Sequence, residues 1–367
     1  MKKLRPVIIS ILILIMTVMS GCGLLRSFMG GNPEKAQANS VGMFAYEQLS
    51  EKEKEVYNTM ENVLTNHQEK AVVETISDEN MKRVFYCVLV DHPEIFWCSS
   101  FERSSVKIGD STVKTEFVPI YSMDKQTRYD YKEQIDKTAD SWLAKIPADA
   151  SDYDKAKILF ETLVTEVSYD SNSAENQNII SVFVNKSTVC QGYSKAYQFL
   201  LSKVGIESTL VKGVANNEAH SWNLVKMDGD YYYTDVTWGN PQFSSKGISA
   251  KFINYAYFGV TTNELLKSHQ IDAEIQLPEC TAIKDNYFQK EGLYFDTKNA
   301  NIVGDAIYTA NADNKNYISL KFANDDTYNW AKDYFITQRN VFKFYSSASK
   351  VFMYNNDELK VMSVLFR

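Results

Sequence analysis

The sequence predicts an α+β protein centred on a helix that carries a cysteine and packs on an antiparallel sheet that carries a histidine and an aspartate. Apolar residues recur at helical spacing after Cys190. Two β-rich runs, residues 221–227 and 231–238, are separated by Asp228-Gly229-Asp230, and an Asp-Gly between such runs is a strong hairpin signal. We expect a helix-rich N-terminal region before this centre and a small α+β unit after it.

The helix after Val189 has its apolar face at Tyr193, Ala196, Tyr197, Leu200, Leu201 and Val204. Ser187 or Thr188 is expected to cap its start, and Gly205 to end it. Cys190 then lies in the first turn, where unpaired N–H groups and the helix dipole favour a thiolate and can stabilise an oxyanion. Gly192 is expected to keep the sulfur accessible. A small buried core cysteine is the alternative for Cys190 alone.

His220 and Asp235 fall on the predicted hairpin. If Asp228-Gly229 is a two-residue turn, Met227 faces Asp230, and His220 and Asp235 are diagonal neighbours on one face of the sheet. A three-residue loop would put them on opposite faces. A thiol, an imidazole and a carboxylate together are the parts of an activated cysteine nucleophile. Each residue alone is better explained by a structural role, so the prediction depends on the trio.

These residues resemble the transglutaminase-like superfamily, a papain-like branch that includes transglutaminases and related cysteine peptidases and amidases. The resemblance spans roughly residues 151–241. It rests on the helix at 152–167 with Tyr169-Asp170, and on Val189-Cys190-Gln191-Gly192-Tyr193, Gly205-Ile206, Val211-Lys212-Gly213, His220-Ser221-Trp222-Asn223 and Tyr233-Thr234-Asp235-Val236-Thr237-Trp238. The surroundings of the cysteine look more like those of bacterial secreted members than those of the calcium-dependent animal enzymes.

The resemblance implies that Cys190 is the nucleophile, His220 the general base and acid, and Asp235 the carboxylate that orients the imidazole. It also implies a side-chain donor in the oxyanion hole, for which Tyr169 and Gln191 are candidates. Aromatic residues near the trio either line the substrate groove or belong to the core, and the groove candidates are Trp222 and Trp238.

The activity implied is acyl transfer from a protein or peptide amide. Water as acceptor gives proteolysis or deamidation, and a lysine amine gives a cross-link. The rival interpretation is a non-catalytic envelope module that binds or assembles on the same fold. We expect no cofactor. We also expect no metal, because no Cys or His spacing is typical of zinc and Asp228-Gly229-Asp230 lacks the ligand spacing of an EF-hand.

The N-terminus predicts where the protein is located. Basic residues precede an apolar run, residues 7–19, which is too short to span a bilayer and is typical of a secretory signal peptide. Val18-Met19-Ser20-Gly21-Cys22 resembles a bacterial lipobox, although Met19 replaces the usual Leu. Lipids on Cys22 would anchor the protein to the cell membrane, on its extracytoplasmic face. An ordinary signal peptide with an incidental Cys22 is the alternative.

Composition limits the partners. The chain has 367 residues, of which 44% are hydrophobic, and this is enough for a substantial core. The net charge of −7, with no basic cluster among aromatic residues, argues against nucleic acid. A protein or peptide substrate, including one of the cell envelope, is expected. Cys87, Cys98 and Cys280 allow one disulfide in an oxidising compartment, but the sequence does not select a pair and we predict none.

The chain divides into five expected segments: a lipoprotein signal peptide (1–21), a flexible tether (22–40), a helix-rich region (41–150), the catalytic domain (151–260) and a C-terminal α+β unit (281–367). In the helix-rich region we expect a helix after the capping box Ser50-x-x-Glu53, helices at 78–90 and 124–145, and strands at 94–97 and 114–121. Beyond Trp238 we expect a short helix at 264–269 with His269 in solvent, then strands at 292–297, 317–322, 342–345, 350–354 and 360–366 and helices at 302–312 and 325–338.

Overall fold

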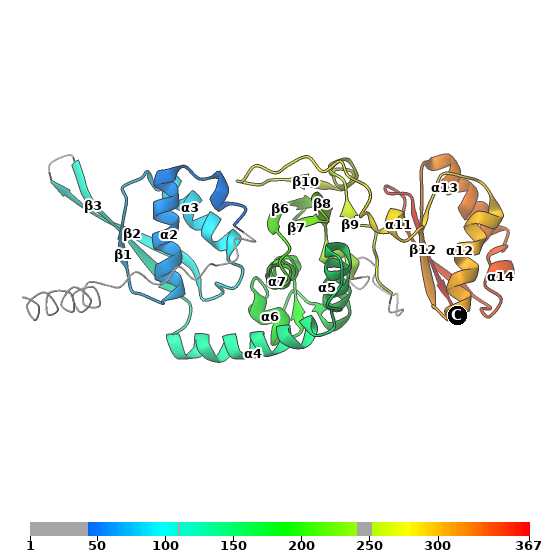
Figure 1. Cartoon of the computed structure of the whole chain (residues 1–367), viewed down its shortest axis with the longest axis horizontal. Coiled ribbons are helices and arrows are strands. Elements are labelled where there is room, and N and C mark those ends of the chain that lie inside the picture. Colours follow the sequence, from blue (N-terminus) through cyan, green and yellow to red (C-terminus); the bar gives the residue numbers. More distant parts are fainter. Residues whose placement is uncertain (1–42, 109–110, 241–251) are drawn as a thin grey trace, which may run out of the picture. The chain divides into compact units, whose positions relative to one another are not determined.

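The computed structural model describes residues 43–108, 111–240 and 252–367 (Figure 1). The predicted signal peptide, the tether and the lipidation site at Cys22 lie outside the described residues. Helices and mainly antiparallel sheets alternate along the chain, and the helix that begins at Cys190 packs on the strand that carries His220. The predicted α+β class is therefore confirmed. No helix among the residues described is both long enough and apolar enough to cross a membrane.

The N-terminal region combines helices with a three-stranded antiparallel sheet in the order β1-β3-β2. Its elements are η1 (Tyr46–Gln48), α2 (Glu51–Thr65), β1 (Ala71–Val73), α3 (Asp78–Asp91), β2 (Cys98–Ile108), β3 (Ser111–Tyr121) and α4 (Lys125–Leu143). The predicted capping box of Ser50 and Glu53 is confirmed at the start of α2. The predicted strand at 94–97 is wrong: the Ile95 N–H donates to the His92 carbonyl in a turn, and β2 begins only at Cys98.

The central region holds a five-stranded antiparallel sheet in the order β10-β6-β7-β8-β9, with α5 and α7 against it (Figure 1). In chain order the elements are α5 (Asp152–Glu166), β4 (Ser168–Tyr169), α6 (Ile179–Phe183), β5 (Ser187–Thr188), α7 (Cys190–Lys203), β6 (Ser208–Ala215), β7 (Glu218–Met227), β8 (Asp230–Thr234), α8 (Val236–Gly239), β9 (Phe258–Val260), α10 (Thr262–Leu265) and β10 (His269–Ile271).

The β7–β8 hairpin has the predicted two-residue turn. Met227 pairs with Asp230, and Asp228 and Gly229 have φ values of 47° and 97°, as a primed hairpin turn requires. The predicted strand to residue 238 is too long, because β8 stops at Thr234. Asp235 instead caps the short helix α8, its side chain accepting a hydrogen bond from the Trp238 N–H.

The start of α7 differs from the prediction. Val189 is its N-cap residue and supplies no side-chain cap, while Ser187 and Thr188 form β5 and pair with β4. The Thr188 hydroxyl is already engaged with the Asn176 carbonyl and the Ser181 hydroxyl. The end of the helix is as predicted, since Gly205 follows it with a φ of 81°.

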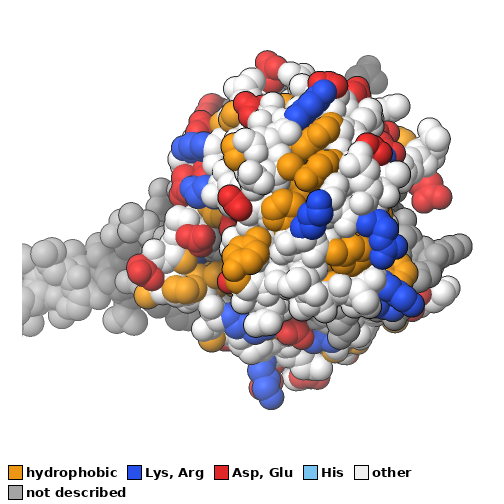
Figure 2. Space-filling view, turned by 90° about the vertical axis from the view of Figure 1, so that its right-hand side faces the viewer, with side chains coloured by type: hydrophobic (Ala, Val, Ile, Leu, Met, Phe, Trp, Pro, Cys, Tyr) orange, Lys and Arg blue, Asp and Glu red, His pale blue; other side chains and the backbone are white. Residues whose placement is uncertain are grey.

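The C-terminal region is a four-stranded sheet, ordered β11-β12-β14-β13, with helices packed on it. Its elements are α11 (Tyr287–Lys290), β11 (Tyr294–Phe295), α12 (Ala300–Ala312), β12 (Tyr317–Phe322), α13 (Asp325–Ala331), the π-helix η2 (Lys332–Thr337), α14 (Val341–Phe344), β13 (Val351–Asn356) and β14 (Val361–Phe366). The predicted strand at 342–345 is wrong, because those residues lie mostly in α14, where Val341 is buried in the core of this region. Figure 2 views the protein from the right-hand side of Figure 1 and shows a band of hydrophobic side chains among charged ones on that face.

Two buried hydrophobic clusters support these regions. The larger one extends from the N-terminal helices through the central sheet and also includes Leu359 and Val361. The smaller cluster lies within the C-terminal sheet and helices and includes Met362 and Val364. Strand β14 and the turn before it therefore contribute side chains to both clusters.

Candidate active site

Cys190 lies at the first position of α7, where the sequence places it. Its side chain is partly buried and its thiol is free. A Cβ atom on Gly192, two residues further along α7, would overlap the Thr188 hydroxyl and approach both the Asn176 carbonyl and the Ser181 hydroxyl to 3.0 Å. The glycine is therefore required for the close packing of α7 against these residues. It does not act by clearing a path to the sulfur.

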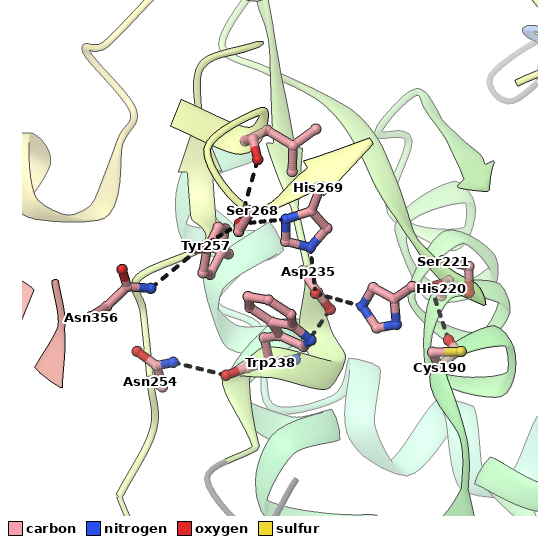
Figure 3. A network of polar contacts seen from close by, with 12 residues as sticks. Cys190, His220, Ser221, Asp235, Trp238, Asn254, Tyr257, Ser268, His269 and Asn356 are labelled. Atoms are coloured by element: carbon pink, nitrogen blue, oxygen red, sulfur yellow. Dashed lines mark hydrogen bonds and ion pairs between the residues drawn. The ribbon is translucent and has the colours of Figure 1, made fainter. Parts of the chain in front are cut away.

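His220 and Asp235 come together behind the cysteine (Figure 3). The His220 Nε2 donates to Asp235 Oδ2 over 2.8 Å, and the two side chains are 5% and 0% exposed. The other carboxylate oxygen, Oδ1, accepts from the Trp238 N–H over 3.1 Å. A buried, hydrogen-bonded carboxylate of this kind fixes both the tautomer and the orientation of the imidazole.

Cys190 and His220 shift each other's proton affinity in opposite directions. Burial raises the pKa of the Cys190 thiol, but hydrogen bonding with His220, the charge of His220 and a hydrogen bond with Ser221 outweigh it and lower the pKa. Burial lowers the pKa of His220, but the charge and hydrogen bond of Asp235, followed by the interactions with Cys190, raise it. The Asp235 carboxyl has a pKa far below its usual range, because His220 and His269 overcome its burial. These shifts favour a thiolate–imidazolium pair at neutral pH.

Ser221 is a site residue that the sequence analysis missed. Its hydroxyl helps to lower the pKa of the thiol and accepts from the Ser194 hydroxyl over 3.3 Å. Ser194 is also hydrogen-bonded to the Cys190 carbonyl, and its own carbonyl accepts from the Asn223 amide. The position of Ser221 directly after His220 was the only sequence signal for it. These bonds tie the first turn of α7 to β7.

The two oxyanion candidates occupy different environments. The Gln191 amide donates to the Gln177 carbonyl over 3.3 Å, so this donor is already engaged. Tyr169 lies on the same groove as Cys190. Burial, the charge of Cys190 and the charge of Glu218 raise the pKa of the Tyr169 phenol, which keeps it a proton donor at neutral pH. Tyr169 therefore brings a phenol donor to the groove on which Cys190 lies.

A groove of about 700 Å³ opens onto Cys190 and His220. It is lined by Tyr169, Cys190, Ala215, Asn216, Glu218, Ala219, His220, Trp238, Asn254 and the segment from Tyr354 to Glu358. Trp238 is therefore a groove residue, as the sequence analysis allowed. Trp222 is not: it is fully buried and packs its ring 4.8 Å from that of His269, so it belongs to the core.

His269 contradicts the prediction of a solvated residue. It is 1% exposed, and its Nε2 lies 3.3 Å from Asp235 Oδ2, the same oxygen that binds His220. The predicted helix at 264–269 ends at Leu265, and His269 instead opens strand β10, paired with β6. Nothing in the local sequence distinguishes this histidine, because its position depends on a pairing between strands more than fifty residues apart.

His220, Asp235 and His269 also form the group of potential metal ligands found in the described part of the chain, with ligand atoms within 4.8 Å of one another. Two imidazoles and a carboxylate suit zinc. Here, however, the His220 Nε2 and the Asp235 Oδ2 are at direct hydrogen-bond distance. Hydrogen bonding alone accounts for the arrangement, and we assign no ion to it.

The proposed site residues lie in the part of the chain that matches a known protein family. Residues 140–236 match the family model of the transglutaminase-like superfamily, and this segment contains Cys190, His220 and Asp235. The resemblance found on the sequence is thus confirmed over these residues. A search of curated protein sequences finds no match.

Three solved structures are similar to part of the chain. They are a TGase (16% identity, TM-score 0.28, covering 46% of this chain and 50% of that one), a proposed cysteine protease from Cytophaga hutchinsonii (12%, 0.25, 38% and 62%) and a proposed protease from Parabacteroides distasonis (9%, 0.23, 37% and 36%). The chain thus spans half the length of the first of these.

Proposed function

We propose that this protein is a cysteine acyl-transfer enzyme that acts on protein or peptide amides. The observation that carries the proposal is the buried His220–Asp235 pair behind a cysteine whose thiol pKa is lowered, all within the transglutaminase-like segment. The groove that opens onto Cys190 gives an extended substrate access to the sulfur. A thiolate held ready at neutral pH is what nucleophilic attack on an amide requires.

In the first half-reaction, the Cys190 thiolate attacks the amide carbonyl carbon and forms a carbon–sulfur bond. The carbonyl oxygen becomes an oxyanion, which the N–H groups of the first turn of α7 and the Tyr169 hydroxyl can stabilise. His220 then gives its proton to the amide nitrogen, the carbon–nitrogen bond breaks, and an amine or ammonia leaves. Asp235 keeps the imidazole oriented throughout. The product is a thioester on Cys190.

In the second half-reaction, His220 removes a proton from the acceptor, which attacks the thioester carbonyl carbon. The carbon–sulfur bond then breaks, Cys190 leaves as the thiolate, and the thiolate–imidazolium pair is restored. Water as acceptor yields a carboxylic acid, the outcome of proteolysis or deamidation. A lysine amine yields a new amide, the outcome of cross-linking. Both share the first half-reaction, and the choice depends on how water and amines reach the thioester. We propose further that the enzyme works outside the cytoplasm, anchored by lipid on Cys22, with cell-envelope proteins or peptides as substrates.

The test of the proposal is the pH dependence of iodoacetamide alkylation at Cys190, measured by mass spectrometry in the wild type and in His220→Gln. The wild-type thiol should react with an apparent pKa below the ordinary value of about 8.5, and His220→Gln should raise that pKa and slow the reaction at pH 7 at least tenfold. Cys87, Cys98 and Cys280 serve as internal controls, because burial raises the pKa of each to about 12, 11 and 12 respectively.

His92→Gln is the matched control variant, since His92 bonds to Glu94 in the N-terminal region and lies outside the groove. It should leave the alkylation profile of Cys190 unchanged. A thiol of ordinary pKa that does not respond to His220→Gln would contradict the proposal and favour the non-catalytic binding module.

The acceptor is identified next, with a glutamine-containing protein and a fluorescent primary amine. Incorporation of the amine indicates transfer, ammonia release without incorporation indicates deamidation, and new peptide termini indicate proteolysis. Location is tested separately with Cys22→Ser, which should release the full-length protein from the membrane fraction.

A further inference from the structure

Asp235 accepts more hydrogen bonds than the orientation of one histidine requires. His220 Nε2 and His269 Nε2 both lie within hydrogen-bond distance of Oδ2, at 2.8 and 3.3 Å, and the Trp238 N–H bonds to Oδ1 (Figure 3). Each of these donors approaches a carboxylate that is fully buried. A second imidazole therefore acts on the same oxygen that orients the proposed general base.

The surroundings of His269 are aromatic and closed to solvent. Its side chain is 0% exposed, and its ring lies between those of Trp222, Trp238 and Tyr257, at centroid distances of 4.8, 4.6 and 5.0 Å. Within such a cage the ring is held in one orientation. Its two nitrogens must then find partners among the few polar groups that face it.

The second nitrogen of His269 ends a chain of hydrogen bonds. Asn356 Nδ2 donates to Tyr257 Oη over 3.3 Å, Tyr257 Oη is 2.6 Å from Ser268 Oγ, and Ser268 Oγ is 2.8 Å from His269 Nδ1. The Asn356 amide group can only donate at its nitrogen, so Tyr257 accepts there and has its own O–H free to donate to Ser268. If Tyr257 donates to Ser268, the Ser268 hydroxyl hydrogen is available to Nδ1.

The direction of this chain fixes the tautomer of His269. If Nδ1 accepts from Ser268, the ring proton resides on Nε2, which faces Asp235 Oδ2. The bond from Ser268 Oγ to the Leu265 carbonyl, at 3.5 Å, is the longest of its contacts and competes least. Burial raises the pKa of Tyr257 to about 12, so the phenol remains a donor throughout the neutral range.

We propose that His269 is a positioning residue: its Nε2–H is the second donor to Asp235 Oδ2, and Ser268, Tyr257 and Asn356 hold the ring in that orientation. It acts on the reaction only through Asp235 and His220. Its effect on the reaction rests on the proposed function, but its tautomer and its bond to Asp235 do not.

The hydrogen-bond chain that holds His269 extends into the C-terminal region. Asn356 is the last residue of β13 and lines the groove, so the far end of the hydrogen-bond chain lies on the groove wall. The region without a catalytic motif thus contributes both to the wall of the site and to the orientation of its carboxylate.

The tautomer is tested by NMR of the full chain labelled with ¹⁵N in the histidine rings. Only four histidines are present, so each signal can be assigned by single substitutions. We expect the ring whose signals disappear in His269→Gln to carry its hydrogen on Nε2 and to accept at Nδ1. Ser268→Ala should alter the Nδ1 signal of that ring. A His269 ring that carries its hydrogen on Nδ1 and accepts at Nε2 would overturn the proposal.

The effect on the thiol is tested with a matched pair of variants. His269→Leu removes the donor, whereas His269→Gln keeps an N–H near the position of Nε2. A hydrogen bond to a charged group corresponds to about tenfold or more in rate. We therefore expect His269→Leu to slow the alkylation of Cys190 at pH 7 about tenfold and to raise its apparent pKa, and His269→Gln to restore most of the rate.

The outcomes separate this role from a structural one. A purely structural histidine would lower the melting temperature in both variants and leave the apparent pKa of Cys190 where it was. If His269→Leu fails to fold, the comparison of His269→Gln with the wild type and the NMR measurement still decide. A fixed Nε2–H tautomer in a protein whose Cys190 has an ordinary thiol would disprove the proposed function while leaving the bond from His269 to Asp235 intact.

Discussion

At the residue scale, Cys190 and His220 exchange a proton without changing the number that the pair binds. In the unfolded chain between about pH 7 and 8, the thiol holds one proton and the imidazole is mostly neutral. In the folded protein the pKa of the thiol is lowered and that of the imidazole is raised, so the proton resides on His220. Both states bind one proton, and the pair adds almost no pH dependence to stability in this window.

In Cys190→Ala, the free energy of unfolding should depend on pH through His220 alone. Asp235, the largest factor that raises the pKa of His220, remains in the variant, so folded His220 keeps its proton while the unfolded imidazole loses it above about pH 6.5. The stabilisation is fully present below pH 6.5 and is lost as pH rises toward the raised pKa. The free energy of unfolding should fall by up to about 1.4 kcal/mol per pH unit, measured by urea denaturation at pH 6.5, 7.5 and 8.5.

The double variant Cys190→Ala/His220→Gln is the control for this slope. It lacks the titrating imidazole and should regain the flat profile of the wild type in the same window. Equal slopes in the wild type and in Cys190→Ala would show that the imidazole is not protonated in the folded state, and would contradict the thiolate–imidazolium pair.

The residues of the candidate site that could be predicted from the sequence are those that belong to local motifs. Cys190 at a helix start and His220 on the β7–β8 hairpin are local features, and their predicted places are correct; Asp235 directly follows the hairpin and caps α8 instead of lying in the strand. His269, Ser221 and the segment from Tyr354 to Glu358 reach the site through strand pairing and packing between distant segments. No spacing rule within a single sequence brings such residues together.

At the scale of elements, strand β10 positions His269, and Gly213 allows β10 to come close. Gly213 lies in β6 opposite Ile271 of β10 and opposite His220 of β7. A Cβ atom at this position would overlap the Gln270 carbonyl oxygen and lie 2.7 Å from Trp222 Cη2. Gln270 adjoins His269, and Trp222 packs on its ring, so both obstacles belong to the surroundings of the second histidine.

Gly213→Ala should therefore push β10 away from β6 and withdraw His269 from Asp235. Overpacking of this kind costs about 1–3 kcal/mol in the free energy of unfolding. We also expect slower alkylation of Cys190 at pH 7, by the same route as in His269→Leu. Urea denaturation and mass spectrometry of the alkylated protein measure the two effects.

Lys212→Ala is the matched control, because its side chain is exposed on the same strand and its backbone bonds are kept. It should change stability by less than about 1 kcal/mol and leave alkylation unaffected. If Gly213→Ala behaves like this control, β10 tolerates the added methyl group and its close approach is not needed for the position of His269.

In two places the local hydrophobic pattern predicted strand residues that the structure does not place in a strand. The hydrophobic run to Trp238 looked like strand, but β8 ends at Thr234 because Asp235 turns inward to His220 and caps α8. Residues 342–345 alternate like a strand, yet they lie mostly in the helix α14, packed in the C-terminal core. In both cases tertiary packing decided between two conformations that the local sequence allowed.

At the scale of the whole molecule, the C-terminal hairpin joins the two hydrophobic clusters. Leu359, in the turn between β13 and β14, is 1% exposed and belongs to the cluster of the central sheet, as does Val361. Met362 and Val364, further along β14, belong to the C-terminal cluster. The turn that carries Leu359 follows directly on the groove residues from Tyr354 to Glu358. Fold stability and the wall of the site thus depend on the same segment.

Leu359→Ala should consequently destabilise the entire protein rather than the C-terminal region alone. Removal of a fully buried leucine side chain costs about 2–5 kcal/mol in the free energy of unfolding. Because the turn bridges both clusters, we expect one cooperative transition in urea, at lower midpoint, by tryptophan fluorescence and by far-UV circular dichroism. Phe352→Ala, on the same hairpin but 46% exposed, should cost less than about 1 kcal/mol. A separate early transition of the C-terminal region in Leu359→Ala would show that the two clusters unfold independently, and that the groove wall is held by its own region and not by the central core.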